Sequence, residues 1–111
     1  MAQKTQSQPL VARLLAARRE VQRLNKEMEE QTGVTGTRAL VLHALLSHDS
    51  VSQTRLVELT GVDRSTLADV VRRLLATGHI TRRRSKSDSR AYVVRLTEQG
   101  RLAAQRINLT L

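Results

Sequence analysis

The sequence predicts a mainly α-helical protein with one small β-hairpin, and three observations lead to this fold class. Apolar residues recur at helical spacing in several stretches, among them 10–28 and 67–75. Two short β-rich runs, 80–84 and 90–96, flank a polar loop. Tyr92 is the only aromatic residue, so the core has to be built from Leu, Val, Ile and Ala, a set that packs well between helices. The length of 111 residues suits a single domain.

The N-terminal segment combines a polar start with a long amphipathic pattern. Residues 1–7 are polar, and we expect them to form a mobile arm. Pro9 suits the first turn of a helix, which we expect over residues 8–33, with Gly33 and Gly36 breaking it. Apolar residues in this helix follow the 3-4 spacing of a coiled-coil seam: Leu10, Leu14, Ala17, Val21, Leu24 and Met28. Because Val11 and Leu15 widen the stripe, we expect one side of the helix to touch its own domain and the other a second subunit.

The next segment predicts the centre of the core. A helix is expected over about 38–47, with Thr35 or Thr37 as its cap. It is apolar almost all round, so we expect it to lie in the middle of the core. Val51 is expected to form a short strand beside the hairpin, and Ser52 to cap the helix that follows.

The stretch 52–75 has the pattern of a helix, a tight turn and a longer helix. Gly61 suits a turn that needs a positive φ, and Asp63 suits the cap of a helix that starts near Arg64. Apolar residues of that helix form one stripe towards the core: Leu67, Val70, Val71, Leu74 and Leu75. The opposite face is small, polar and cationic: Ser65, Asp69, Arg72 and Ala76, with Thr66 and Arg73 beside them. The helix alone is equally compatible with a solvated surface and with a surface that reads DNA.

The hairpin that follows favours the DNA-reading interpretation of this helix. Alternation places Tyr92, Val94 and Leu96 on one face, as a half-buried antiparallel strand requires. The first run and the loop are strongly basic: Arg82, Arg83, Arg84 and Lys86. A helix-turn-helix followed at once by a basic hairpin is a winged helix, whose helix can enter a major groove while the wing reaches a neighbouring groove or phosphates. We therefore expect residues 34–111 to form a winged helix-turn-helix domain.

The stretch Leu56–Gly100 resembles the core of the MarR family of bacterial transcription regulators. The resemblance includes D-R-S-T-L at Asp63–Leu67 and D-x-R-A at Asp88–Ala91, and it covers roughly residues 36–104. It implies a DNA-binding dimer, usually a repressor on a pseudo-palindromic site, with an arginine at the wing tip that enters the minor groove. Arg90 matches that position.

The sequence departs from the family pattern in two ways. Asp69 is acidic on the outward helix face, where the resemblance would place base contacts. The chain also ends soon after the wing. In the resembled family, small molecules often bind between the dimerisation helices and the reading domain. Since this chain has little helix after the wing to wall such a pocket, we expect constitutive binding or control by a protein partner.

Charge and composition agree with a nucleic-acid partner. The net charge is +9 and the isoelectric point is about 11.5. Residues 1–51 carry +2, residues 52–96 carry +6 and residues 97–111 carry +1, so the excess lies on the expected reading module. The absence of Cys removes disulfides and thiolate zinc sites. Without a spanning segment or a signal peptide, we expect a cytoplasmic, nucleoid-associated protein with no membrane contact.

An enzyme is not expected. The five glycines are isolated and form no phosphate-binding loop, and no nucleophile motif or carboxylate pair stands out from cap and turn roles. The three histidines have no metal-binding spacing; His43, within the apolar helix, is expected to pack or to form a hydrogen bond. We expect neither a cofactor nor a metal.

These observations predict a sequence-specific regulator of transcription that binds double-stranded DNA as a homodimer. The resemblance implies a repressor, whereas the residues alone do not distinguish a repressor from an activator. Ser65, Thr66 and Arg72 are expected to contact bases, with Arg64 and Arg73 on phosphates or guanine edges. Wing residues are expected to contact phosphates and the minor groove: Arg82, Arg83, Arg84, Lys86 and Arg90. Asp63 supports the site as a helix cap, and Asp88 by orienting Arg90. The alternatives are a winged-helix protein-interaction module, such as an anti-activator or adaptor, and a protein that coats DNA regardless of sequence.

Overall fold

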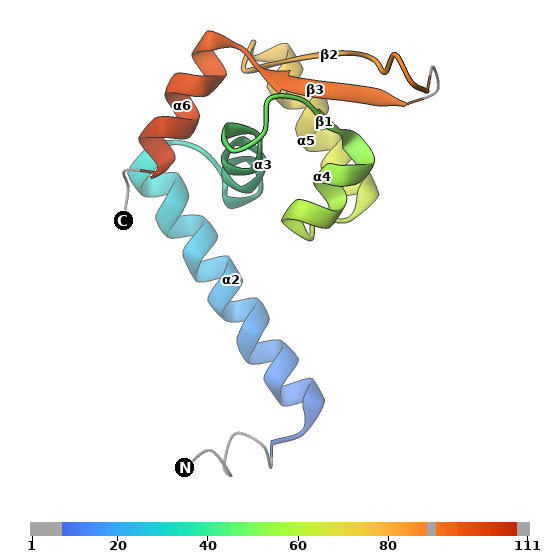
Figure 1. Ribbon diagram of the computed structural model, residues 1–111. Coiled ribbons are helices and arrows are strands. Elements are labelled where there is room, and N and C mark those ends of the chain that lie inside the picture. The colour runs from blue at the N-terminus through green and yellow to red at the C-terminus, as the bar shows by residue number, and fades with distance from the viewer. Residues whose placement is uncertain (1–7, 89–90, 109–111) are drawn as a thin grey trace.

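A computed structural model, which describes residues 8–88 and 91–108, shows a helical body from which one long helix projects (Figure 1). The elements follow in this order: α2 (Leu10–Thr32), α3 (Gly36–Leu46), β1 (Val51–Ser52), α4 (Gln53–Thr60), α5 (Arg64–Ala76), β2 (Ile80–Arg84), β3 (Tyr92–Leu96) and α6 (Glu98–Asn108). The predicted fold class, mainly α-helical with a β-hairpin wing, is confirmed. No helix in the described part of the chain is both long enough and apolar enough to cross a bilayer.

The strands form a small antiparallel sheet in the order β1-β3-β2. Val51 of β1 pairs with Val94, which confirms the short strand expected beside the hairpin. In the hairpin, Ile80 lies opposite Leu96 and Arg84 lies opposite Tyr92. The predicted alternation is also correct, because Val94 is buried in the core whereas the following residue, Arg95, is exposed.

The core lies between α3, α4, α5, α6 and the sheet. Its most deeply buried members include Leu42 and Leu45 of α3, Leu56 of α4 and Val94 of β3. The apolar stripe of α5 faces this core as predicted: Leu67, Val70, Val71 and Leu74 are buried, and Leu75 packs partly buried against them. The expectation that the second helix occupies the centre of the core is confirmed, because α3 contacts α2, α4, α5, α6 and β3.

Turn and cap residues behave as their chemistry predicts. Gly61 ends α4 with a φ of 72°, and Gly33 ends α2 with a φ of 76°. The Ser52 hydroxyl accepts a hydrogen bond from the Arg55 N–H at 3.0 Å. Thr97 accepts one from the Gly100 N–H at the same distance, so α4 and α6 both start with a side-chain cap.

Two glycine positions have a packing role. We expected Gly36 to break a helix, yet it is buried and opens α3, where an added Cβ would collide with Asn25 of α2. Gly100 of α6 is also buried, and a Cβ there would collide with the backbone carbonyl of His79. The approach of α2 therefore explains Gly36, and the approach of the turn between α5 and β2 explains Gly100.

Thr35 takes the cap position of α3, although its side chain forms no cap hydrogen bond.

The sequence predicts Leu102, Ile107 and Leu109 as weak anchors of the last helix. Ile107 is buried as predicted, together with Ala104, whereas Leu102 is exposed. Leu109 lies outside the described residues. The face of α6 that carries Ala104 and Ile107 packs on α3 and the core, and Leu102 lies outside that contact.

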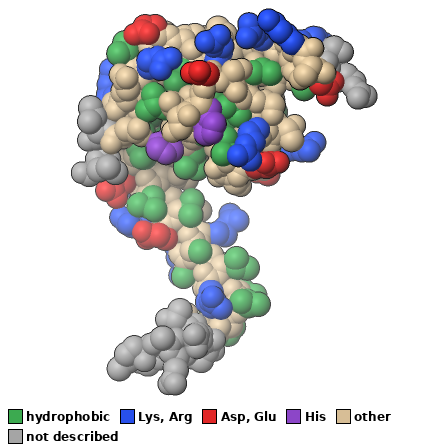
Figure 2. Space-filling view, viewed as in Figure 1, with side chains coloured by type: hydrophobic (Ala, Val, Ile, Leu, Met, Phe, Trp, Pro, Cys, Tyr) green, Lys and Arg blue, Asp and Glu red, His purple; other side chains and the backbone are tan. Residues whose placement is uncertain are grey.

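Helix α2 touches its own domain only near its C-terminal end. It contains no buried residue, and Met28 is the seam residue that packs against the core. The expected contact with its own domain is therefore confined to the C-terminal part of the helix, where Asn25 lies against Gly36 and Met28 packs against the core. Most of α2 projects into solvent (Figure 1), and Figure 2 shows hydrophobic side chains along this projection. The mobile arm expected at residues 1–7 lies outside the described residues.

Candidate nucleic-acid interface

The start of α5 is fixed by Asp63. Its Oδ2 accepts a hydrogen bond from the Ser65 hydroxyl at 2.8 Å and another from the Thr66 N–H at 3.1 Å. These hydrogen bonds, that of Ser65 most strongly, lower the pKa of Asp63 from 3.8 to about 2, so the carboxylate stays ionised at neutral pH. Because the Ser65 proton is directed to Asp63, the hydroxyl of Ser65 is left with lone pairs for an incoming donor.

The outward face of α5 is uncovered. The expected reading residues on it are all exposed to solvent: Arg64, Ser65, Thr66, Arg72 and Arg73. In the second half of α5, the carboxylate of Asp69 lies close to both Arg72 and Arg73. Its Oδ1 is 3.4 Å from Arg72 Nη2 and its Oδ2 is 3.1 Å from Arg73 Nε. The two expected cationic contacts are thus ion-paired with the same carboxylate.

The wing separates arginines that are consecutive in the sequence. Paired residues of antiparallel strands share a face, so Arg82 and Arg84 lie on the same face as Tyr92. The guanidinium carbons of Arg82 and Arg84 are 4.3 Å and 5.0 Å from the centre of the Tyr92 ring, close enough for cation–π attraction. Arg82 also donates a hydrogen bond to the side chain of Gln53, the first residue of α4, at 3.4 Å. These contacts tie the wing to the helix-turn-helix.

The other face of the hairpin carries Arg83, together with Arg95 opposite Thr81. Both arginines are exposed. Sequence reasoning missed Arg95 as a member of the cationic surface and Gln53 as the hydrogen-bond partner of Arg82. The signal for Arg95 was available, because alternation places it on the side of β3 opposite to Val94 and Leu96. No local pattern could have indicated Gln53, since its contact depends on how the wing packs.

The tip of the wing is described in part. Lys86 is exposed, and the Asp88 carbonyl accepts a hydrogen bond from the Ala91 N–H at 3.0 Å. Arg90 lies outside the described residues, and the expected contact between Asp88 and Arg90 lies there with it. Figure 2 shows Lys and Arg side chains gathered along the wing, at the end of the molecule away from α2. The cationic surface is therefore made by α5 and the wing together.

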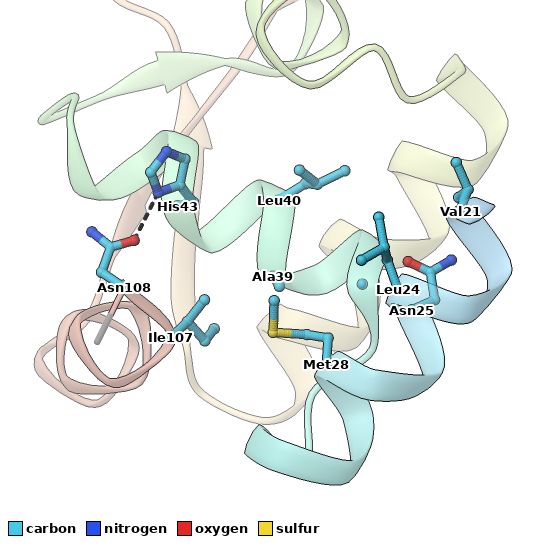
Figure 3. A pocket seen from close by; sticks show the side chains of 10 residues that line it. Val21, Leu24, Asn25, Met28, Ala39, Leu40, His43, Ile107 and Asn108 are labelled. Carbon is cyan, nitrogen blue, oxygen red and sulfur yellow. Dashed lines mark hydrogen bonds between the residues drawn. The ribbon is translucent and has the colours of Figure 1, made fainter. Parts of the chain in front are cut away.

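An open cavity of about 630 Å³ lies between α2, α3 and α6 (Figure 3). Its lining is largely apolar: Val21, Leu24, Asn25, Met28, Gly36, Ala39, Leu40, His43, Ile107 and Asn108. His43 Nδ1 is 2.8 Å from Asn108 Oδ1, which confirms the hydrogen bond expected for this histidine. The expectation of too little helix after the wing to wall a pocket is wrong, because the end of α6 supplies Ile107 and Asn108.

Metal ligation finds no support in the described residues, among which no group of three or more His, Asp or Glu side chains could hold an ion. The cavity histidine is bonded to an amide instead. The exposed face of α5 carries hydroxyls, guanidiniums and the carboxylate of Asp69, and the wing adds further arginines and Lys86.

Comparison with known proteins agrees with this geometry. Residues 32–91 match the sequence profile of the MarR family. The chain belongs to the MarR family. It is 30% identical over 93 residues to the organic hydroperoxide resistance transcriptional regulator of Bacillus subtilis (strain 168), covering 84% of this chain and 63% of that protein. It spans less than two thirds of the length of the curated relatives it matches, which are named as transcriptional regulators and not as enzymes.

Solved structures of MarR proteins share the fold. The PcaV transcriptional regulator from Streptomyces coelicolor, in complex with its natural ligand, has a TM-score of 0.77 and 27% identity, covering 93% of this chain and 75% of that one. A MarR mutant from E. coli, complexed with operator DNA, has a TM-score of 0.76 and 22% identity, covering 89% of this chain and 71% of that one. The predicted family and its winged-helix fold are confirmed.

Proposed function

We propose that this MarR-family chain is a transcriptional regulator that binds double-stranded DNA sequence-specifically in the cytoplasm, as part of the nucleoid. It acts as a homodimer on a pseudo-palindromic operator and represses by occupying the promoter. The observation that carries this proposal is the uncovered polar and cationic face of α5 beside a basic wing. A surface used only for protein contacts would not need this cationic excess.

Reading of bases is assigned to α5. Arg72 is suited to guanine, whose O6 and N7 accept a bidentate pair of hydrogen bonds, and Thr66 to a mixed donor and acceptor edge. Ser65 is suited to a base amine, because its own proton is engaged by Asp63. Arg64 and Arg73 are assigned to phosphates or guanine edges.

We assign contacts with the DNA phosphate backbone to the wing. Arg83 and Lys86 are exposed and can reach phosphates as mobile point charges. Arg82 and Arg84 share the Tyr92 ring, so they present their charges from a more restrained position. The family resemblance assigns Arg90 to the minor groove.

Dimerisation is assigned to α2. Its exposed seam residues include Leu10, Leu14 and Leu24, which are 71%, 64% and 49% accessible to solvent. Residues 10–19 contain three arginines and no acidic residue, whereas residues 20–32 contain four glutamates and two basic residues. An antiparallel pair of α2 helices would place the basic half of each beside the acidic half of the other. It would also bring the partner helix beside the cavity, because Val21 and Leu24 belong both to the seam and to the cavity lining.

Selection of bound fragments from a genomic DNA library, in the presence of competitor DNA, tests this function. The expected result is one motif with two inverted half-sites, whose centres lie about 10 base pairs apart or a multiple of that, as two linked reading helices require. Strong binding without any motif would indicate a protein that coats DNA. No binding would instead favour a protein-interaction module.

A further inference from the structure

Asp69 is the only acidic residue in α5, and both of its carboxylate oxygens are paired within the helix. Arg72 lies at i+3 and Arg73 at i+4, at 3.4 Å and 3.1 Å respectively. The Asp69 side chain is 49% accessible, so water screens both pairs. Exposed pairs of this kind contribute little to folding stability. The main effect of Asp69 is therefore on the availability of Arg72 and Arg73 for contacts with DNA.

The carboxylate of Asp69, paired with two guanidiniums, makes the binding of α5 to DNA less favourable. Each arginine must leave Asp69, or share it, before it can neutralise a phosphate. Once the arginines have left, the carboxylate faces a groove lined mainly by acceptors and phosphates, where an unpaired negative charge is unfavourable. This cost applies to every sequence unless the base opposite Asp69 offers a donor. Cytosine offers one through its N4 amine.

We propose that Asp69 is a specificity-determining residue. It keeps Arg72 and Arg73 from non-cognate phosphates, and it accepts a hydrogen bond from a cytosine amine when α5 lies in its cognate major groove. The proposal rests on the proposed function, since it assumes that α5 reads DNA. Asp69 thereby lowers binding to random DNA more than binding to the operator, which is the repulsive element that a specific interface needs.

Asp69→Asn tests the assignment, because it removes the charge and keeps the shape. The control is Glu98→Gln on α6. Glu98 is exposed in the first turn of α6, so this change removes an equal charge outside α5, the wing and α2. Binding to the selected operator and to random duplex is measured over a series of salt concentrations. Asp69→Glu and Asp69→Ser are measured in parallel, so the result does not depend on how one variant folds.

In Asp69→Asn and Asp69→Ser, binding to random DNA should tighten and its log–log salt slope should steepen by about one unit for each arginine released. The ratio of operator to random affinity should fall about fivefold or more, with base preference relaxed at one position. Asp69→Glu should retain most of the discrimination, and Glu98→Gln should leave both the ratio and the slope unchanged.

Other outcomes separate the two proposals. A wild-type protein that prefers no sequence would overturn the proposed function, and the role of Asp69 with it. A discriminating wild type whose Asp69→Asn and Asp69→Ser variants keep the same ratio and slope would overturn the role of Asp69 alone. Equal changes in Glu98→Gln would show that net charge, and not the position of Asp69, sets the discrimination.

Discussion

The dimer assignment can be tested by placing charges in the α2 seam. Leu14→Glu combined with Leu24→Glu keeps the length of the helix and nearly all of its helix propensity. Both leucines are exposed in the single chain, so neither change should disturb the core. Only a contact with a second copy would be affected, because that contact would have to bury two carboxylates from each chain.

The expected magnitude follows from the accessible fractions, 64% for Leu14 and 49% for Leu24. A fully buried leucine contributes roughly 2 kcal/mol, so burying these fractions in both copies contributes about 4 to 5 kcal/mol. At about 1.4 kcal/mol per factor of ten, its loss weakens dimerisation by about three orders of magnitude. The desolvation of the new carboxylates adds to this effect.

Light scattering at micromolar concentration measures the result. The wild type should have a mass of about 25 kDa, twice the 12.4 kDa of one chain, and the double variant should have the mass of one chain. Ala16→Glu combined with Gln22→Glu is the control, because it adds the same charge roughly 120° round the helix from the seam. A monomeric wild type, or a double variant that stays dimeric, would refute the interface.

The other predictions concern α5 and the wing. Arg72→Ala should cost about 1 to 3 kcal/mol on the operator and relax one base position, whereas Arg83→Ala should weaken all sequences alike; equal losses on operator and random DNA for both would remove Arg72 as a reader. Arg90→Ala should weaken binding and reduce the salt slope by about one unit, and an unchanged slope would contradict docking of the wing. Asp63 has a folded pKa of about 2, below its ordinary 3.8, so its stabilising effect is present above about pH 4 and is lost as the pH falls through 2. The difference in melting temperature between wild type and Asp63→Ala should therefore shrink over that interval, and a constant difference would contradict the ionised cap.

Local chemistry explains why much of the fold could be read from the sequence. Gly61 adopts the positive φ of the turn, and Asp63 accepts a hydrogen bond from a free N–H at the start of α5. Both requirements are met by residues close to each other in the sequence, so both could be predicted. The role of Gly36 could not be predicted in this way. Its lack of a side chain matters only because α2 crosses α3 at that point, and such a contact joins residues far apart in the sequence.

The same distinction applies to the candidate site. The charges of the wing were predictable, whereas their division between two faces depends on the hairpin register. Arg82 and Arg84 share the Tyr92 ring because they are two residues apart, and Arg83 between them faces the other way. Likewise, Asp69 was recognisable as an acidic exception, but its pairing with both arginines required side-chain geometry.

Packing within a single chain does not explain the length of helix α2 or its apolar seam. The helix has 23 residues and none is buried, although its apolar residues keep the spacing of a seam. Ion pairs from Arg23 to Glu20 and Glu27 support the helix, but exposed pairs contribute only tenths of a kcal/mol each. In proteins most of the stability of a helix comes from packing of its apolar face, and exposed apolar surface of this extent is unfavourable. A second copy packed along the seam would remove both difficulties, and it would hold two α5 helices at a fixed separation. On this argument the same contact would stabilise α2 and set the spacing of the operator half-sites.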